Sequence, residues 1–562
     1  MPLKPIFDQA PLMAMNALPL RAGLVRMENP AMNKLYQQIE MTNEPTAFEG
    51  AFRLACIVSA KPGETPVAAK IRAMLSAQKE DGSFMLSFKE SVAVLRAAWA
   101  MYEYEARKPL LEHIARWCAY AVQHWDALMA DDDIWVYSAD LLEMLENLYR
   151  VTGKSAVLAL CERVANQTMG WSSVLNTFSN QRPSSRATTR EELVEALSRE
   201  NGSREGYYTR FLRTNHAESL ADGARSTMMK GWYSGSATEL NATANGWERL
   251  YRHHGAVCGG LTSDELLEGT APSAVVSSAA LGAWAEALCA AALNEKNAWA
   301  YAALERMAFN AMPAVLQGET LAAFQRVNAL NDQVDENVCF WLNENHGARA
   351  LDRMARGYAA LASNVVTVRA DGADVNLYMP GRFAVPVEDE LLIFTMKATG
   401  KAAELTVHCK QETTEATIRL RIPVWSRATE VMVNGADNHQ EVKNGMMTFD
   451  RTWHDGDVIV LTFDQTLYVE DGHHQGKAIF RGPVLMALPA TGDNWKQAFA
   501  AVNEEDNRVT ATLASVKEWK IKDGVPADLP VLPETGEMKA FALAPYARTA
   551  ARIALFPGRK QA

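Results

Sequence analysis

The chain has 562 residues and is acidic, with 56 basic and 67 acidic side chains and a formal net charge of −11. This length exceeds the size at which one hydrophobic core stops growing, so we expect two or more domains. The acidic balance argues against a nucleic-acid-binding protein, which usually carries a basic face.

Seven scattered cysteines without a CxxC pair argue against a disulfide framework and favour a reducing compartment. The first residues contain no apolar run of signal-peptide length, and no stretch approaches the roughly 18 apolar residues of a membrane span. We therefore predict a cytoplasmic protein that does not bind membranes.

The first two thirds of the chain are predicted to be helical. Apolar residues recur at steps of three and four over residues 92–102, 141–148 and 281–291, which is typical of one buried helix face. Abundant alanine favours helix in these segments. Glycines within residues 81–83 and 153–155 predict breaks between helices.

Residues 179–201 have a different composition, rich in Ser, Arg, Thr and Asn. We predict a surface insertion there, and the alternative is a lid over a site. From about residue 366 the chain alternates between apolar and polar residues, as in 405–409, 416–422 and 458–463, which predicts strands. Asn434-Gly435 between two such runs predicts a hairpin, so an all-β part follows the helical part.

Cys339 stands in an acidic segment, close to Asp335 and Glu336. A thiol becomes a good nucleophile when a metal, a cation or a helix N-terminus stabilises its thiolate. No Lys or Arg is adjacent, and both carboxylates would raise the thiol pKa if they were close in space. Two alternatives stay open: the nucleophile of a covalent hydrolase, or a small buried side chain.

The acids Asp264, Glu265 and Glu268 follow a Gly259-Gly260 turn. Cleavage of a glycosidic bond needs a proton donor for the leaving oxygen and a second group opposite it. The structural alternative is a helix N-terminus, where Ser263 or Asp264 would be the N-cap residue and the acids of the first turn would face the helix dipole.

His216, His253 and His254 are candidates for sugar contacts, because aromatic, cationic and imidazole groups line sugar sites. Adjacent histidines point to different faces, so we expect only one of His253 and His254 to face a site. The sequence contains no HExxH, CxxC or P-loop pattern, which argues against a local metal or nucleotide site.

Four short motifs in the last third carry a family resemblance: RLRIPVWS at 419–426, VNG at 433–435, FDRTWHDGDV at 449–458 and RGPV at 481–484. Together they resemble glycoside hydrolase family 127, the β-L-arabinofuranosidase-like group also called DUF1680. The resemblance implies an (α/α)6-type helical barrel over residues 1–365, followed by one or more β-sandwich domains over residues 366–562.

The resemblance also implies roles for site residues. Residues 215–218 are similar to a family segment whose histidine contacts the sugar, which assigns that contact to His216. Residues 259–265 are similar to the stretch that holds the acid/base glutamate, so Glu265 is the first choice and Glu268 the second. Cys339 stands where the family has its nucleophile, the first of two adjacent cysteines.

The family's zinc is held by a Glu-x-Cys segment and by both adjacent cysteines. Residues 272–279 contain neither Glu nor Cys, and Phe340 replaces the second cysteine, so three of the four ligands are missing. We therefore expect no cofactor, with zinc as the alternative. In a metal-free reaction Asp335 or Glu336 would act together with Glu265.

The sequence thus predicts a glycoside hydrolase-like enzyme that acts on a small saccharide or glycoside, with an arabinofuranoside as first candidate. The alternatives are a sugar-binding protein without hydrolysis and a sugar lyase or epimerase on the same scaffold. A homodimer is possible on this sequence, and the sequence does not decide it. The predicted catalytic residues are Glu265, Cys339 and Glu268, and the predicted sugar contacts are His216, His254, His253, Trp232, Asp335 and Glu336.

Overall fold

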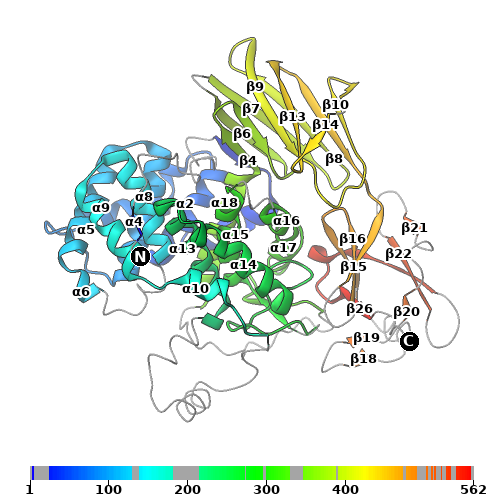
Figure 1. Cartoon of the computed structure of the whole chain (residues 1–562), viewed down its shortest axis with the longest axis horizontal. Coiled ribbons are helices and arrows are strands. Elements are labelled where there is room, and N and C mark those ends of the chain that lie inside the picture. Colours follow the sequence, from blue (N-terminus) through cyan, green and yellow to red (C-terminus); the bar gives the residue numbers. More distant parts are fainter. Residues whose placement is uncertain are drawn as a thin grey trace.

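The computed structural model separates a helical N-terminal region from C-terminal sheets (Figure 1). It describes residues 3–4, 24–128, 138–181, 214–271, 274–294, 299–328, 346–387, 390–438, 440–471, 476–489 and 539–557, together with short strands between 502 and 532. The predicted fold class, helices followed by sheets, is confirmed. The last helix ends at Val365 and the next strand begins at Val366.

Six helices form an inner ring in which each contacts the next and the last returns to the first. They are α2 (Phe48–Val58), α4 (Phe88–Glu105), α8 (Ser138–Thr152), α13 (Ala217–Ser234), α15 (Ser278–Ala292) and α18 (His346–Val365). The helices outside this ring are α1 (Pro30–Ile39), α3 (Pro66–Ser76), α5 (Lys108–Gln123), α6 (Trp125–Leu128), α9 (Ser155–Gln167), α10 (Trp171–Asn176), α14 (Ala237–His254), α16 (Trp299–Arg306) and α17 (Met312–Ala314). This closed ring is the predicted (α/α)6-type barrel.

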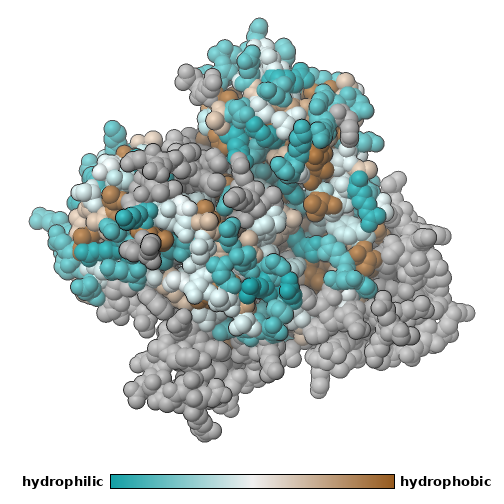
Figure 2. Space-filling view, in the orientation of Figure 1, coloured by the Kyte–Doolittle hydropathy of each residue, from teal (hydrophilic) through white to brown (hydrophobic). Residues whose placement is uncertain are grey.

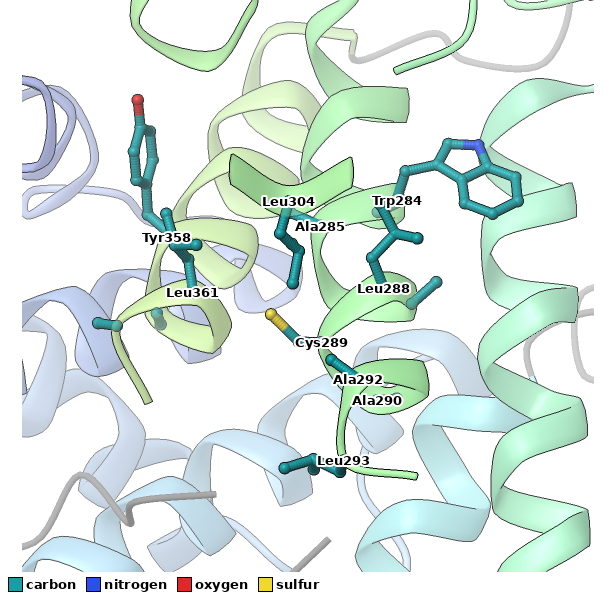
Figure 3. Packing of buried hydrophobic residues seen from close by; sticks show 14 of the residues in the cluster. Trp284, Ala285, Leu288, Cys289, Ala290, Ala292, Leu293, Leu304, Tyr358 and Leu361 are labelled. Atoms are coloured by element: carbon teal, nitrogen blue, oxygen red, sulfur yellow. The ribbon is translucent and has the colours of Figure 1, made fainter. Parts of the chain in front are cut away.

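Local sequence explains where the inner helices begin and how closely they pack. Helix α4 starts with a capping box, in which Ser87 N donates to Glu90 Oε2 (2.9 Å) and Glu90 N donates to Ser87 Oγ (3.3 Å). Helices α15 and α18 touch at Gly282, where an added Cβ would lie 2.1 Å from the carbonyl oxygen of Arg353. In Figure 3 Cys289 of α15 and Leu361 of α18 lie in the same buried cluster.

The predicted strands form two stacked sheets beside the barrel (Figure 1). The first sheet has the order β1 (Val25–Met27), β6 (Gly381–Val387), β7 (Glu390–Ala398), β8 (Ala402–Cys409), β14 (Val458–Phe463), β10 (Thr429–Val433) and β11 (Ala436–Asp437). The second has the order β12 (Val442–Lys443), β13 (Met446–His454), β9 (Thr413–Arg421), β5 (Gly372–Val375) and β4 (Val366–Arg369). Phe383, Leu405 and Ile418 are fully buried, as expected for the inward faces of a sandwich.

A third sheet follows the sandwich. It contains β15 (Leu467–Asp471), β16 (Gly476–Arg481), β17 (Val484–Pro489), β24 (Ala544–Pro545), β25 (Arg552–Ile553) and β26 (Leu555–Pro557). The remaining strands are β2 (Val275–Ser277), β3 (Phe324–Arg326), β18 (Val502–Asn503), β19 (Arg508–Val509), β20 (Thr512–Leu513), β21 (Lys520–Ile521), β22 (Ala527–Leu532) and β23 (Lys539–Ala542).

The predicted hairpin at Asn434-Gly435 is confirmed. Both residues have positive φ, 52° and 77°, and they join β10 to β11. The Asn434 side chain also binds the turn before β14, since its Nδ2 donates to Asp457 Oδ1 (2.8 Å) and its Oδ1 accepts from Val458 N (2.8 Å). The motifs at 433–435 and 449–458, which are apart in sequence, therefore form one structural unit.

Contacts between the helical barrel and the sandwich include side-chain bonds to Glu305 and one early strand. Arg421 and Trp425 both bind Glu305 of α16, at 2.6 Å and 2.9 Å. Strand β1 lies before the first helix yet pairs with β6, with Arg26 opposite Arg382. The predicted boundaries placed this segment with the helices, because three residues are too few for a periodic signal.

The described residues expose few large apolar side chains, and the face in Figure 2 is mostly hydrophilic with hydrophobic residues in small groups. Across the described ranges, no helix has both the length and the apolar character needed to cross a bilayer. The predicted insertion at 179–201 lies almost entirely outside the described residues, which end at Gln181 on that side.

Candidate functional site

The loop between α14 and α15 folds over the N-terminal end of α13, and this brings two predicted residues together. Ala217 N donates to Glu265 O (2.9 Å), and Leu267 N donates to Asn215 O (3.1 Å). His216 pairs with Leu266 in an isolated β-bridge. Glu265 is therefore held beside His216 by main-chain hydrogen bonds, and we call the region around His216, His254, Glu265 and Glu268 the rim site.

His216 is the N-cap residue of α13. Its Nδ1 accepts a hydrogen bond from Ser219 N at 3.2 Å and lies 3.1 Å from Ser219 Oγ. The neutral ring therefore carries its proton on Nε2. The side chain is 2% exposed, so the ring orientation is fixed by the cap and by burial.

Glu265 has an unusual backbone conformation. Its φ is 111°, a region that L-residues other than glycine rarely adopt, and the residue is buried. Strain of this kind is typical of functional sites, where the surrounding structure holds a side chain in one place. The N-cap alternative for Ser263 or Asp264 is wrong, because the next helix, α15, begins only at Ser278 and is capped by Ser277.

His254 and Glu268 are also at the rim, but both are used by the fold. His254 is fully buried, with Nδ1 accepting from Gly269 N (3.0 Å) and Nε2 lying 3.0 Å from the carbonyl oxygen of Asn180. The carboxylate of Glu268 accepts a hydrogen bond from Val275 N (2.7 Å). These contacts favour a structural role for both residues over the predicted contact with sugar or proton transfer.

The structure does not bring Trp232 to the rim. It lies sixteen residues beyond His216 on α13, which is about 24 Å along the axis at a rise of about 1.5 Å per residue. His253 is half-buried on α14, whereas its neighbour His254 points inward. Cys339, Asp335 and Glu336 lie outside the described residues, so their predicted roles stay predictions.

The described residues of 272–279 do not suit zinc. Val275 and Val276 are apolar, the Ser277 hydroxyl caps α15, and the Ser278 hydroxyl donates to the carbonyl oxygen of Ala323 (3.0 Å). Within the described ranges, no group of three metal-ligating side chains is found. The expectation of no cofactor stays a prediction.

Below the rim, the centre of the barrel is filled by buried ion pairs, which we call the central ion cluster. Among the described residues it comprises Arg53, Arg96, Arg225, Arg349, Arg353 and Arg356 with Glu49, Glu103, Asp140, Glu143, Glu218, Asp222, Glu286 and Asp352. Every one of the six inner helices contributes to it. The paired positions show that α2 and α4 run in the same direction, since Glu49 and Arg53 of α2 meet Arg96 and Glu103 of α4 in that order.

Glu218 links the rim to this cluster. It follows His216 by two residues, and its carboxylate accepts from Arg349 Nε (2.9 Å) and Arg353 Nε (2.5 Å). Burial alone would raise the pKa of Glu218, but the two guanidinium groups outweigh burial and hold the pKa well below its usual range. Glu218 is therefore a fixed anion that orders the first turn of α13.

The cluster contains more carboxyl than guanidinium groups, and its electrostatics reflect this. Burial raises the pKa of Asp352 to about 7, with Arg356 partly opposing it and the carboxylates of Glu49 and Glu286 adding to it. Burial likewise raises the pKa of Glu103, against the effect of Arg53. Asp140 has the opposite shift, because Arg356, Arg96 and Arg225 overcome its burial and lower the pKa.

The sequence reasoning missed this cluster. A signal was present, since Arg349, Asp352, Arg353 and Arg356 recur at steps of three and four along α18. A charged face at helical spacing is usually assigned to solvent. Here that face points into the barrel, where Arg353 and Arg356 are only 4% and 6% exposed.

Comparison with known proteins adds to the geometry. Residues 372–465 match the family profile described as the middle domain of GH127 β-L-arabinofuranosidase. This segment holds strands β5 to β14 and three of the four motifs noted in the sequence. No curated protein sequence matches the chain.

Several solved structures share the fold over nearly the whole chain. A GH127 β-L-arabinofuranosidase from Geobacillus stearothermophilus T6 is 16% identical, with 94% of each chain covered and a TM-score of 0.61. A GH127 β-arabinofuranosidase is 15% identical over 99% of this chain and 98% of its own, with a TM-score of 0.61. A protein described as a glycoside hydrolase is 13% identical, with 95% and 96% covered and a TM-score of 0.64. The middle of the chain therefore matches a GH127 domain, and its whole-chain fold is similar to that of solved GH127 β-L-arabinofuranosidases.

Proposed function

We propose that this protein is a glycoside hydrolase that cleaves a small saccharide or glycoside at the rim site, with Glu265 as proton donor to the leaving oxygen. One observation carries the proposal: main-chain hydrogen bonds hold Glu265, a buried residue in a strained backbone conformation, against the start of α13 next to His216. Glycosidic cleavage needs such a positioned acid. Two solved relatives described as arabinofuranosidases make β-L-arabinofuranosides the first substrates to test.

In this mechanism the chain's own residues position the sugar and move one proton. Glu265 gives its proton to the oxygen of the departing group as the glycosidic bond breaks. His216, oriented by its cap on α13, contacts a sugar hydroxyl, and Glu218 holds that end of the helix through Arg349 and Arg353. Cys339, or a carboxylate near it, is proposed as the group on the opposite face of the sugar.

The sharpest test compares substrates whose leaving groups need a proton to different degrees. We expect Glu265→Gln to lower kcat/KM at least about a hundredfold on an alkyl arabinofuranoside, which is within the usual contribution of general acid catalysis. On a nitrophenyl arabinofuranoside the loss should be much smaller, because nitrophenolate leaves without protonation. Equal losses on both substrates would refute the role of Glu265 as acid.

Two control variants separate chemistry from folding. Glu248→Gln changes an exposed glutamate on α14 and should leave both substrates unaffected. Glu268→Gln weakens the hydrogen bond to Val275 N, so it should lower thermal stability without the dependence on leaving group. If Glu268→Gln, and not Glu265→Gln, loses activity only on the substrate whose leaving group needs a proton, then Glu268 is the acid.

Sugar binding without hydrolysis is a second candidate, favoured by residues 274–279, whose side chains do not suit the family's zinc. Calorimetry and product analysis on the same sample would separate the two functions. Saturable binding of an arabinoside with no free sugar after long incubation would select the binding protein. Product formation would exclude it.

A further inference from the structure

Residues 544–556, which we call the C-terminal segment, pack against the helical region. The segment contains β24, a short 3₁₀ turn at Tyr546–Arg548, β25 and the start of β26. Figure 1 shows part of it, in red, beside α17, and the 3₁₀ turn contacts α17. The segment therefore belongs to the third sheet and to the surface of the barrel at the same time.

Arg552 is at the centre of this contact. Its Nη2 donates to the carbonyl oxygen of Arg326 in β3 (2.8 Å) and to Tyr546 Oη (2.8 Å). Tyr546 Oη in turn donates to the same carbonyl oxygen of Arg326 (3.3 Å). One main-chain carbonyl of β3 therefore accepts two hydrogen bonds from the C-terminal segment.

The surroundings of Arg552 are unusual for a buried cation. The side chain is 1% exposed, and within the described ranges it forms no ion pair with a carboxylate. Besides Tyr546 it binds only the carbonyl oxygens of residues 326, 549 and 550. Burial of a charge without a counter-charge costs free energy, so this side chain is better explained by the main chain that it fixes than by stability.

Strands β2 and β3 form a ribbon that connects this contact to the rim site. Val275 of β2 stands directly opposite Arg326 of β3. Val275 N donates to the Glu268 carboxylate (2.7 Å) and Val275 O accepts from Ser263 N (2.8 Å), so both groups point away from β3. One edge of the ribbon therefore holds the loop of the rim site, and the other edge holds the C-terminal segment.

Both glutamates of the rim depend on Val275. Ser263 pairs with Leu267 in an isolated bridge, and Glu265 lies in the turn that this bridge closes. Glu268 is held directly through its carboxylate. A displacement of Val275 would therefore move whichever of the two glutamates protonates the leaving oxygen.

Asn328 forms a second link, two residues after Arg326. The side chain is fully buried, and its Oδ1 accepts from Ala554 N (2.9 Å) and Leu555 N (3.0 Å) while its Nδ2 donates to Leu555 O (3.2 Å). The amide thus binds the C-terminal segment through both its donor and its acceptor. The chain at β3 is fixed at two successive points.

We propose that the C-terminal segment is part of the catalytic unit and positions the rim glutamates through β3 and β2, with Arg552 as the main positioning residue. This inference rests on the proposed function, since it assigns the segment a role in glycosidic cleavage without contact with the substrate. The position of the acid matters, because a misplacement of about 1 Å can cost about a hundredfold in rate.

Two conservative variants test the link. Arg552→Lys keeps the charge, but one ammonium group does not reproduce the planar fork that spans residues 326 and 549. Tyr546→Phe keeps the ring and removes one hydrogen bond to the Arg326 carbonyl. The measurement is the kcat/KM on an alkyl arabinofuranoside divided by that on a nitrophenyl arabinofuranoside.

We expect Arg552→Lys to lower this ratio about fivefold or more, and Tyr546→Phe about twofold, because a displaced acid matters most where the leaving group needs a proton. A smaller folded fraction reduces both activities equally and leaves the ratio unchanged. An unchanged ratio in Arg552→Lys would overturn the proposal. If that variant does not fold, the ratio in Tyr546→Phe decides.

Trp425→Phe is the matched control. It removes the hydrogen bond to Glu305 (2.9 Å), which also connects a sheet to the helical region but does not involve β3. We expect lower thermal stability with an unchanged ratio. If Trp425→Phe lowers the ratio as much as Arg552→Lys does, any loosening between sheets and helices has the same effect, and the specific role of Arg552 is refuted.

Hydrogen exchange supplies a readout that needs no turnover. In Arg552→Lys, exchange in peptides that contain the Ser263 and Val275 amides should be about tenfold faster, while exchange within residues 446–454 of the sandwich stays unchanged. Unchanged exchange at Ser263 and Val275 would overturn the link to the rim. Faster exchange there, in a protein that cleaves neither arabinofuranoside, would confirm the link and refute the proposed function instead.

Discussion

The helical barrel and the β-sandwich bury opposite kinds of side chain. At the centre of the barrel, Arg96, Arg353 and Arg356 are 4–6% exposed and pair with carboxylates, whereas Ile418 and Leu405 in the sandwich are fully buried among apolar groups. Two sheets pack face to face at a distance that apolar side chains fill. A ring of six helices leaves a wider axial space, and long paired side chains span it.

This difference separates stability from function. Buried ion pairs compensate their desolvation only when every partner is present, so they contribute little net stability but fix the positions of many groups. Apolar packing contributes stability directly. We therefore expect the barrel centre to be intolerant of single charge removals, and the sandwich to tolerate surface changes while supporting the fold.

The largest expected effect is on the charge balance of the barrel. Arg356→Met removes one arginine partner of Asp140 and of Glu286 and should lower the free energy of unfolding by about 4 kcal/mol, because these buried carboxylates lose part of their counter-charge. Chemical denaturation would measure this. Arg419→Met, in the exposed pair with Asp371, should cost less than about 1 kcal/mol. Similar losses in both variants would refute the comparison.

Removing an apolar side chain from the interior should have a slightly smaller effect on the free energy of unfolding. It should change stability alone. Ile418→Ala opens a cavity between the sheets and should lower the free energy of unfolding by about 3 kcal/mol. Binding of sugars to the folded protein should not change. Glu415→Ala, on the exposed face of the same strand, serves as the control and should change stability by less than about 0.5 kcal/mol.

A pH series would sharpen the electrostatic side of the comparison. Since the folded-state pKa of Asp352 is raised to about 7, its stabilising contribution is complete below the unfolded pKa and is lost as the pH rises to about 7. Asp352→Asn should therefore gain stability relative to the wild type as the pH rises from about 4 to about 7. Denaturation at each pH would measure the gap.

The control for that pH series is Asp371, whose contribution to stability should change with pH in the opposite direction. Arg419 lowers the pKa of Asp371, so the contribution of Asp371 is present above the unfolded pKa and is lost as the pH falls. Asp371→Asn should therefore differ from the wild type at neutral pH and approach it in acid. If the difference in unfolding free energy between Asp352→Asn and the wild type stays constant with pH, Asp352 ionises normally.

The smallest expected effect concerns strain at the rim. Glu265→Gly should raise the free energy of unfolding by about 1 kcal/mol, because glycine accepts a φ of 111° without the clash of a Cβ atom. Glu265→Ala keeps that clash and should show no such gain. Thermal unfolding of the two variants would separate the strain from the loss of the carboxylate.

The sequence predicted the parts of this molecule that depend on local periodicity. Helix spacing located α4, α8 and α15, and the Asn434-Gly435 pair located the hairpin. These features could be predicted because one face of each element is apolar and the turn chemistry is specific. The motifs around 419–458 predicted the match to the GH127 middle domain for the same reason, since they are packing and turn signals.

The candidate site was predicted only in part, because it depends on how the ring closes. The adjacency of His216 and Glu265 followed from family resemblance, not from spacing. Trp232 was placed with them, although the length of α13 separates the two positions. The inward charged face of α18 was also missed, because sequence alone does not show that α2, α8, α13 and α15 supply its partners.

Strand β1 has a consequence for how the protein forms during synthesis. Residues 25–27 leave the ribosome early, but their partner, β6 at 381–387, emerges only after every inner helix has been made. The first segment must therefore wait unpaired until translation is more than half complete. A fragment that begins at residue 366 would lack this strand and expose the edge of β6, which makes association between copies its expected fate.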